Sequence, residues 1–155
     1  MPGSATLGKS VPDFELAATG GKTFKLSQHN KLLVLYFYPK DNTPGCTTEG
    51  TDFRDLHSKF AKAGVEIFGI SRDSIKSHEN FKAKLELPFD LLSDPDELAC
   101  ALFGVMKMKN MYGKQVRGVE RSTFVIDAKG VLVQEWRGVK VAGHAQDVLN
   151  FVKAL

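Results

Sequence analysis

One stretch in the first third of the chain constrains the fold more than any other. Residues 32 to 38 are apolar, β-branched and aromatic, which is typical of a buried strand, and the run is too short to span a membrane. Pro39 ends this strand, and Pro44 and Gly45 then form a turn. An amphipathic helix is expected from Thr47 onward, because apolar side chains recur at spacings of three and four.

The cysteine of this turn, Cys46, lies beside the expected first residues of the helix. Unpaired backbone N–H groups and the positive end of the helix dipole favour a thiolate there. Cys46 is therefore a candidate nucleophile. Thr43 precedes it by three residues, so its hydroxyl is expected to reach the sulfur and an incoming oxygen. Arg121, at the start of a later strand, would stabilise developing negative charge, and Pro39 would shield the pocket from water.

Composition limits the classes of protein to which the chain can belong. Its 155 residues and 43% hydrophobic content predict one domain, residues 1 to 155, with residues 1 to 10 as a flexible lead. The net charge of +3 is spread along the chain without a basic run, which argues against nucleic acid as a partner. The first ten residues hold no apolar segment, so we expect no secretory signal, no membrane association and a cytoplasmic location.

Predicted strands and helices alternate along the chain. The expected strands are residues 11–16, 22–26, 32–38, 65–70, 89–92, 119–126 and 131–136. The expected helices are residues 47–63, 74–85, 95–104 and a last helix from about 144. The methionine-rich residues 105 to 117 lack clean periodicity and are predicted to be a long loop. This order predicts an α/β fold with a central mixed sheet, helices on both faces and an N-terminal β-hairpin.

The segment around Cys46 resembles the active-site signature of peroxiredoxins, in particular the peroxiredoxin Q or bacterioferritin comigratory protein group. Further segments of the chain are similar to the same group. The similar segments are Gly8-x-x-x-Pro12-Asp13-Phe14, Tyr36 to Glu49 with Pro39-x-x-x-Thr43-x-x-Cys46, Gly69-Ile70-Ser71, Leu92-Ser93-Asp94, Tyr112-Gly113-Lys114 and Arg121 to Asp127.

This resemblance implies a thioredoxin-like fold of the peroxiredoxin type and thiol-dependent reduction of hydrogen peroxide and alkyl hydroperoxides, without a cofactor or a metal. Cys46 would attack the peroxide and become a sulfenic acid, while Thr43 and Arg121 orient the peroxide. Glu49 would hold Arg121 or order the first helical turn; an ordinary acidic residue near a helix start is the alternative. The resemblance also implies a monomer or a weak dimer.

The chain departs from the group at the position of the resolving cysteine. Many members carry that cysteine five residues after the first one, where this chain has Thr51, and residues 74 to 87 contain none either. Cys100 is the remaining cysteine, and its apolar neighbours predict that it is buried in a helix. We therefore expect a 1-Cys mechanism, in which an external thiol (thioredoxin, glutaredoxin or glutathione) reduces Cys46.

The four histidines have no metal-ligand spacing and are expected on surfaces or at helix ends, and His57 lies too far along its helix to serve Cys46 as the base of a hydrolase. A glutathione-peroxidase-like enzyme lacks its own flanking motifs here. A redox sensor or chaperone-like switch, in which oxidation of Cys46 changes an interaction, stays open as the alternative.

Overall fold

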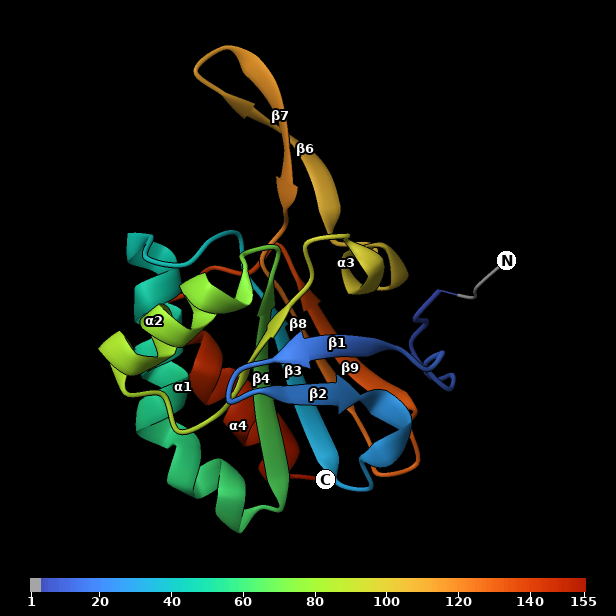
Figure 1. Cartoon of the computed structure of the whole chain (residues 1–155). Helices are drawn as coiled ribbons and strands as arrows, with labels where there is room; N and C mark the ends of the chain where they lie inside the picture. Colours follow the sequence, from blue (N-terminus) through green and yellow to red (C-terminus); the bar gives the residue numbers. More distant parts are fainter. Residues whose placement is uncertain (1–3) are drawn as a thin grey trace.

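The computed structural model describes residues 4–155, which form a central sheet with helices packed against it (Figure 1). The sheet has seven strands in the order β2-β1-β5-β4-β3-β8-β9. The strands are β1 (Glu15–Ala18), β2 (Lys22–Lys25), β3 (Leu32–Phe37), β4 (Val65–Ser71), β5 (Leu91–Ser93), β8 (Ser122–Ile126) and β9 (Leu132–Arg137). Strands β3, β4 and β5 run parallel and the remaining pairs are antiparallel, so the predicted mixed sheet is confirmed.

Strand β3 lies in the middle of the sheet, and its side chains alternate between the two faces. Val34 and Tyr36 enter one buried cluster, whereas Leu35 and Phe37 enter the other. A strand that is covered on both sides must be apolar throughout, and this explains the uninterrupted apolar run in the sequence.

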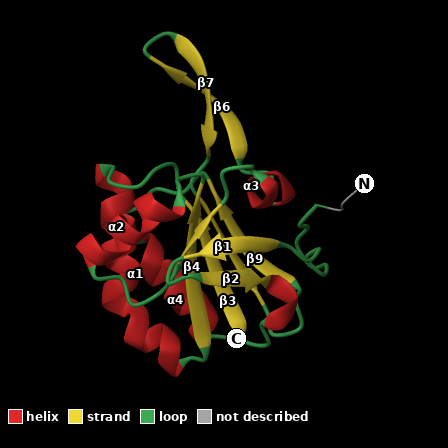
Figure 2. Cartoon of the chain, in the orientation of Figure 1, coloured by secondary structure: helices red, strands yellow, loops and turns green. Residues whose placement is uncertain are grey.

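Helices cover both faces of the sheet, as Figure 2 shows by secondary structure. Helices α1 (Pro44–Lys62), α2 (Ile75–Leu85) and α4 (His144–Lys153) pack on the face of Tyr36. The short helix α3 (Leu98–Leu102) packs on the opposite face, together with the one-turn 3₁₀ helix η1 (Leu26–Gln28). No helix in the described part of the chain has the length and apolar character needed to cross a membrane.

Two predicted segments were wrong. Residues 105 to 117 are not a loop: β6 (Met106–Met111) and β7 (Lys114–Val119) pair with each other as an antiparallel hairpin. The third helix does not start at residue 95, because Glu97 adopts a left-handed conformation with φ 59° and the helix begins only at Leu98. The carboxylate of Asp94 accepts the backbone N–H of Leu98 and so closes the turn ahead of that helix.

The expected flexible lead falls partly outside the described residues, which begin at residue 4. From Ala5 onward the segment is docked on the body of the molecule. Ala5 is buried and its N–H donates to the Leu102 carbonyl, while the N–H of Gly8 donates to the Leu132 carbonyl. These bonds tie the segment to α3 and β9.

Candidate active site

Helix α1 begins earlier than the sequence pattern predicts, so Cys46 lies inside its first turn. Thr43 is the extended residue ahead of the helix, and Pro44 is the first helical residue, a position that suits proline because no backbone N–H is needed there. Cys46 is the third helical residue and its side chain is only 2% exposed. Its sulfur therefore lies at the positive end of a 19-residue helix, away from bulk water.

Arg121 meets Cys46 from the other side of the site. It lies in the short link between β7 and β8, and its Nη2 donates to the Cys46 sulfur over 3.4 Å. Gly45 makes room for this approach, since a Cβ at that position would stand 3.2 Å from Arg121 Nη2. A positive group within hydrogen-bond distance stabilises negative charge on the sulfur.

Glu49 holds the guanidinium in this position. It lies one turn after Cys46 on α1, and Arg121 Nη1 donates to its Oε1 over 2.6 Å. Burial raises the pKa of Glu49 to about 7, and the charge of Arg121 opposes that rise. Burial also lowers the pKa of Arg121, but the charges of Glu49 and Cys46 outweigh this and raise it, so the guanidinium stays charged. The predicted link between Glu49 and Arg121 is thus present.

Thr43 and Pro39 lie in the loop between β3 and α1, ahead of Cys46. The Thr43 hydroxyl donates to the Lys40 carbonyl over 2.9 Å, and among residues 4–155 it makes no hydrogen bond to the Cys46 sulfur. That bond closes the loop ahead of α1 and leaves the oxygen lone pairs of Thr43 able to accept. Pro39 follows β3 and is partly buried. The peroxide-orienting role of Thr43 and the shielding role of Pro39 stay predictions.

The comparisons with known proteins agree with this geometry. Residues 7–135 match the model of the AhpC/TSA family. The chain is 57% identical to a peroxiredoxin Bcp of Xanthomonas campestris, over 92% of this chain and 89% of that protein. It is 49% identical to a peroxiredoxin Bcp of Bacillus subtilis, over 95% and 94%. A PrxQ mutant structure from Xylella fastidiosa superposes with a TM-score of 0.91 at 45% identity, covering 97% of this chain and 96% of that one.

The chain is a peroxiredoxin of the AhpC/TSA family. Both the predicted family and its thioredoxin-like fold are therefore confirmed. The resemblance rested on segments spread from residue 8 to residue 127, and the family match covers nearly the same range, residues 7–135.

A buried polar network that no local sequence pattern indicates anchors the active-site loop of this peroxiredoxin. Asp41 lies in the loop between β3 and α1, and its Oδ2 is 2.7 Å from Nδ1 of His78 on α2. Asp41 also accepts hydrogen bonds from the hydroxyls of Tyr38 at 2.6 Å and Ser77 at 2.8 Å. Burial alone raises the pKa of Asp41, but the hydrogen bonds from His78 and Tyr38 outweigh it and lower the pKa, so the carboxylate is ionised.

The position of His78 corrects a prediction. We expected the histidines on surfaces or at helix ends, yet His78 is fully buried within α2. Its Nε2 lies 2.9 Å from the Leu92 carbonyl, so both ring nitrogens have partners. His144 does lie at a helix start, but it is buried too, and burial lowers its pKa to about 4.

Asp41, Asp73 and His78 are close enough together to hold a cation. Their ligand atoms are instead engaged with protein groups. Asp73 Oδ2 accepts the backbone N–H of Asp41 at 2.9 Å and the Ser71 hydroxyl at 2.6 Å, in addition to the contacts of Asp41 and His78 given above. This network favours a structural role, in which α2 and the end of β4 hold the loop that carries Thr43 and leads to Cys46.

Cys100 lies on the opposite side of the sheet from Cys46. Cys46 belongs to the buried cluster of α1, α2 and α4, whereas Cys100 belongs to the cluster that α3 covers. Cys100 is fully buried, as predicted, and burial together with the neighbouring Asp94 raises the pKa of its thiol far above the usual range. A thiol in this state is a poor nucleophile.

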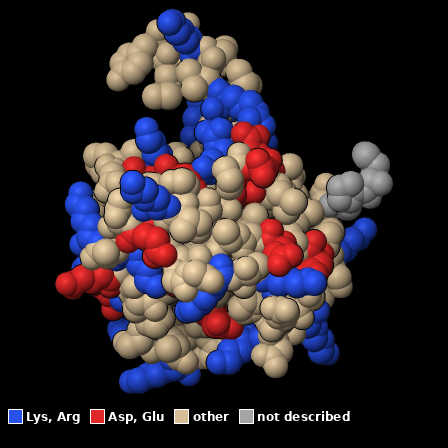
Figure 3. Space-filling view, in the orientation of Figure 1, with Lys and Arg blue, Asp and Glu red and all other residues tan. Residues whose placement is uncertain are grey.

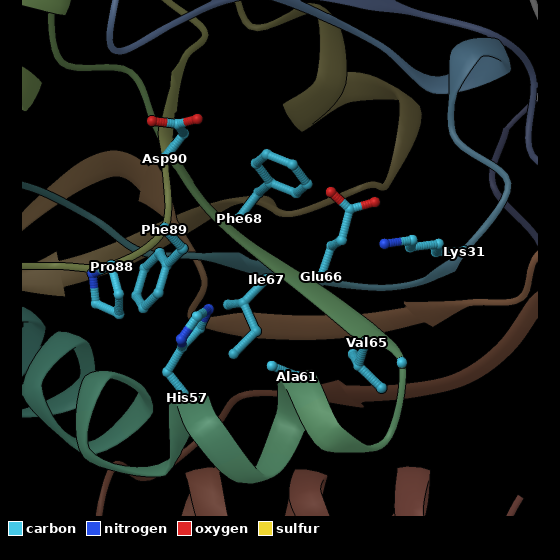
Figure 4. A pocket seen from close by; sticks show the side chains of 11 residues that line it. Lys31, His57, Ala61, Val65, Glu66, Ile67, Phe68, Pro88, Phe89 and Asp90 are labelled. Carbon is cyan, nitrogen blue, oxygen red and sulfur yellow. The ribbon is translucent and has the colours of Figure 1, made fainter.

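A separate surface hollow of about 260 Å³ contains none of these active-site residues. Figure 4 shows His57 beside Phe89 in this hollow, together with Glu66 and Lys31 from the neighbouring segments. His57 thus lines a hollow that holds neither Cys46 nor Arg121, which argues against His57 as the base of a Cys-His hydrolase.

Proposed function

We propose that this peroxiredoxin reduces hydrogen peroxide and alkyl hydroperoxides at Cys46. The observation that carries the proposal is the 3.4 Å contact between Arg121 Nη2 and the Cys46 sulfur at the start of α1. It is supported by a structure of the Xanthomonas campestris bacterioferritin comigratory protein, 56% identical with a TM-score of 0.87, which was described for its alkyl peroxide reduction activity.

In the first half-reaction, the Cys46 thiolate attacks the nearer oxygen of the peroxide. The S–O bond forms as the O–O bond breaks, and the sulfur is oxidised to a sulfenic acid. The leaving oxygen takes a proton and departs as an alcohol or as water. Arg121 would stabilise the negative charge that moves across the two oxygens. The Thr43 hydroxyl, whose hydrogen is donated to the Lys40 carbonyl, would accept a hydrogen bond from the peroxide.

In the second half-reaction, an external thiol reduces Cys46. The incoming thiolate attacks the sulfenic sulfur, a mixed disulfide forms and the hydroxyl leaves as water; a second thiol then releases Cys46 as a thiolate. Three features support this 1-Cys cycle over an internal disulfide. Thr51 occupies the position five residues after Cys46, residues 74 to 87 contain no cysteine, and Cys100 is buried across the sheet.

Steady-state peroxide consumption tests the function. Purified protein is supplied with thioredoxin, glutaredoxin or glutathione in parallel, with Cys46→Ser as the inactive variant and Cys100→Ser as the matched control. We expect turnover that Cys46→Ser abolishes and Cys100→Ser retains. Oxidation that stops after one equivalent, with every reductant, would instead favour the redox-sensor alternative.

Thiol mapping tests the 1-Cys cycle separately. The reduced protein is treated with one equivalent of peroxide and its cysteines are identified by mass spectrometry. We expect a sulfenic acid at Cys46 and a free thiol at Cys100. A Cys46–Cys100 disulfide as the main product would overturn the 1-Cys assignment and leave the peroxidase proposal in place.

A further inference from the structure

The β6–β7 hairpin, residues 105 to 119, projects from the body of the molecule as an arm (Figure 1). Its two strands pair with each other over six residue pairs, and in the described chain neither strand joins the seven-stranded sheet. The base of the hairpin is closed where the N–H of Glu120 donates to the Val105 carbonyl over 2.7 Å, and Arg117 of β7 forms an ion pair with Glu97 of the body. An isolated hairpin is marginally stable in water, so a projecting one calls for an explanation.

The arm concentrates exposed apolar side chains. The large apolar residues exposed on it are Met108 at 60%, Met111 at 49%, Tyr112 at 100% and Val116 at 42%. Leu98, on the adjacent helix α3, is 51% exposed. Single exposed apolar residues are ordinary, but a group of them on one projecting element marks a contact surface for another molecule.

The charges on the arm all have one sign. Lys107, Lys109, Lys114 and Arg117 lie within residues 105 to 119, which hold no acidic residue, and the arm is blue and tan in Figure 3. The whole chain has 21 basic and 18 acidic side chains, so the rest of the molecule is slightly acidic. Arg117 pairs with Glu97, whereas Lys107 and Lys114 form no ion pair with any residue from 4 to 155.

The tip of the arm keeps a strained residue. Tyr112 and Gly113 have φ values of 53° and 79°, the left-handed conformation of a two-residue hairpin turn. Asparagine, aspartate or glycine normally occupies the first of these positions, because a bulky side chain is strained there. Tyr112 is also fully exposed, so its ring stabilises nothing within the fold. A strained residue without an internal role points to a role in binding.

The base of the arm lies next to the active site. Its second strand ends at Val119, two residues before Arg121, whose guanidinium contacts Cys46. A six-residue strand extends about 20 Å. A folded partner of about 100 residues has a radius of gyration near 13 Å, so it can touch the arm and the active site at once.

We propose that the arm is the docking site for the protein thiol that reduces Cys46, and that this partner carries an acidic surface with exposed apolar residues beside its own cysteine. The proposal rests on the proposed function. Because Cys46 is 2% exposed, a protein thiol reaches it only when the first turn of α1 opens. Docking holds the reductant beside the site until then, which raises its effective concentration. The mixed disulfide then forms with loss of water, as described above.

Charge reversal on the arm tests the proposal. The variant is Lys107→Glu/Lys114→Glu, and the matched control is Lys129→Glu/Lys153→Glu. The control changes the net charge equally but acts at the other end of the sheet. Lys129 follows Ile126, which pairs with Leu33 at the start of β3, and Lys153 lies near Lys62 at the end of α1. Turnover is measured with thioredoxin and with glutaredoxin, and with dithiothreitol as a small thiol that needs no docking.

We expect the arm variant to lose about tenfold in kcat/KM for the protein reductant, while the control and all dithiothreitol rates stay within twofold. Added salt should lower kcat/KM for the native protein and have less effect on the arm variant. Equal rates for variant and control would overturn the proposal. Turnover with dithiothreitol but with neither protein would also overturn it and leave the peroxidase function intact, whereas no turnover with any thiol would remove both.

A second variant removes the apolar tip without harming the fold. Tyr112→Asn relieves the strained turn, so the free energy of unfolding should be unchanged or higher. We expect it to lower kcat/KM for the protein reductant about fivefold, whereas Tyr112→Phe, which keeps the ring, should not. If Tyr112→Asn instead abolishes a dimer seen by sedimentation and leaves reductant kinetics unchanged, the arm serves self-association and the docking proposal is overturned.

Discussion

The two cysteines of this peroxiredoxin are almost equally buried, yet their surroundings differ in the sign of the nearest charge. Cys46 is 2% exposed and receives a hydrogen bond from the Arg121 guanidinium. Cys100 is fully buried beside Asp94, whose carboxylate accepts the backbone N–H of Cys100 over 2.8 Å. Exposure alone therefore does not separate the proposed nucleophile from the other thiol. The neighbouring charge does, because it decides whether a thiolate is stabilised.

The strongest test of this contrast is selective alkylation. In the native protein at pH 7, iodoacetamide should modify Cys46 at least about a hundredfold faster than Cys100, which reacts only when the fold opens. Mass spectrometry of peptides over time gives both rates. The Cys100→Ser variant gives the alkylation rate of Cys46 alone. Comparable alkylation rates for the two cysteines in the folded protein would contradict the contrast.

Removal of the Arg121 guanidinium should lower the reactivity of Cys46 toward that of Cys100. Arg121→Gln should slow the reaction with peroxide by about 10²- to 10³-fold, because a donor aimed at developing negative charge is lost. Arg121→Lys should recover part of the rate, since it keeps the charge but loses the forked geometry. Stopped-flow rates under single-turnover conditions measure both. A loss below about threefold for Arg121→Gln would show that the helix start alone activates the thiol.

The site of Cys46 also differs from that of Cys100 in the loop ahead of it, which Asp41 anchors to α2. Asp41→Ala should lower the free energy of unfolding by about 3 kcal/mol, because His78, Tyr38 and Ser77 lose their shared buried acceptor. It should also slow the peroxide reaction about tenfold, since the loop ahead of Cys46 loses its anchor to α2. Denaturant unfolding and stopped-flow kinetics check the two effects.

Asp90→Ala is the matched control for that variant. Asp90 also has three side-chain partners, Thr19, Lys22 and Lys82, but it lies nearer the surface, so we expect a loss of only about 1 kcal/mol and an unchanged peroxide rate. Equal losses of stability for Asp41→Ala and Asp90→Ala would show that the buried network contributes no more to the free energy of unfolding than a partly exposed one.

The smallest expected effect concerns the pH dependence of stability. Burial raises the pKa of Glu49 from its ordinary 4.5 to about 7, so between these values the folded chain binds a proton that the unfolded chain has released. The contribution of Glu49 to the free energy of unfolding therefore falls as pH rises from about 5 to 7. Glu49→Gln removes this slope, and its melting temperature relative to the native protein should rise across that range. If the difference in melting temperature between the variant and the native protein stays constant from about pH 5 to 7, the pKa of Glu49 is not raised to about 7 in the folded chain.

Much of the fold and the centre of the site could be predicted from local patterns. The apolar run at residues 32 to 38 identifies a central strand, because only a strand covered on both faces dispenses with alternation. The helix that follows the turn was predicted from the apolar spacing after Thr47, although it begins three residues earlier, at Pro44. These features depend on residues that are close together in the sequence, so local sequence patterns predict them.

The arm and the buried network could not be predicted in that way. Residues 106 to 109 alternate between methionine and lysine, but neither face of the arm is buried, so the alternation does not reflect a core face and a surface face. The turn could not be predicted either, because Tyr112 occupies a position where asparagine or glycine is expected. His78 is a core residue only because Asp41, 37 positions earlier, lies opposite it.

The sequence by itself therefore determined the family and the α/β order, and it made Cys46 the candidate nucleophile, since these rest on local periodicity and on a motif. The tertiary structure decided which charge stands beside each cysteine: Arg121 is 75 positions from Cys46 and reaches it only because β3 and β8 pair in the sheet. It also decided that α3 places Cys100 on the opposite face. Contacts between distant segments are set by how the strands pair and pack, which no local pattern specifies.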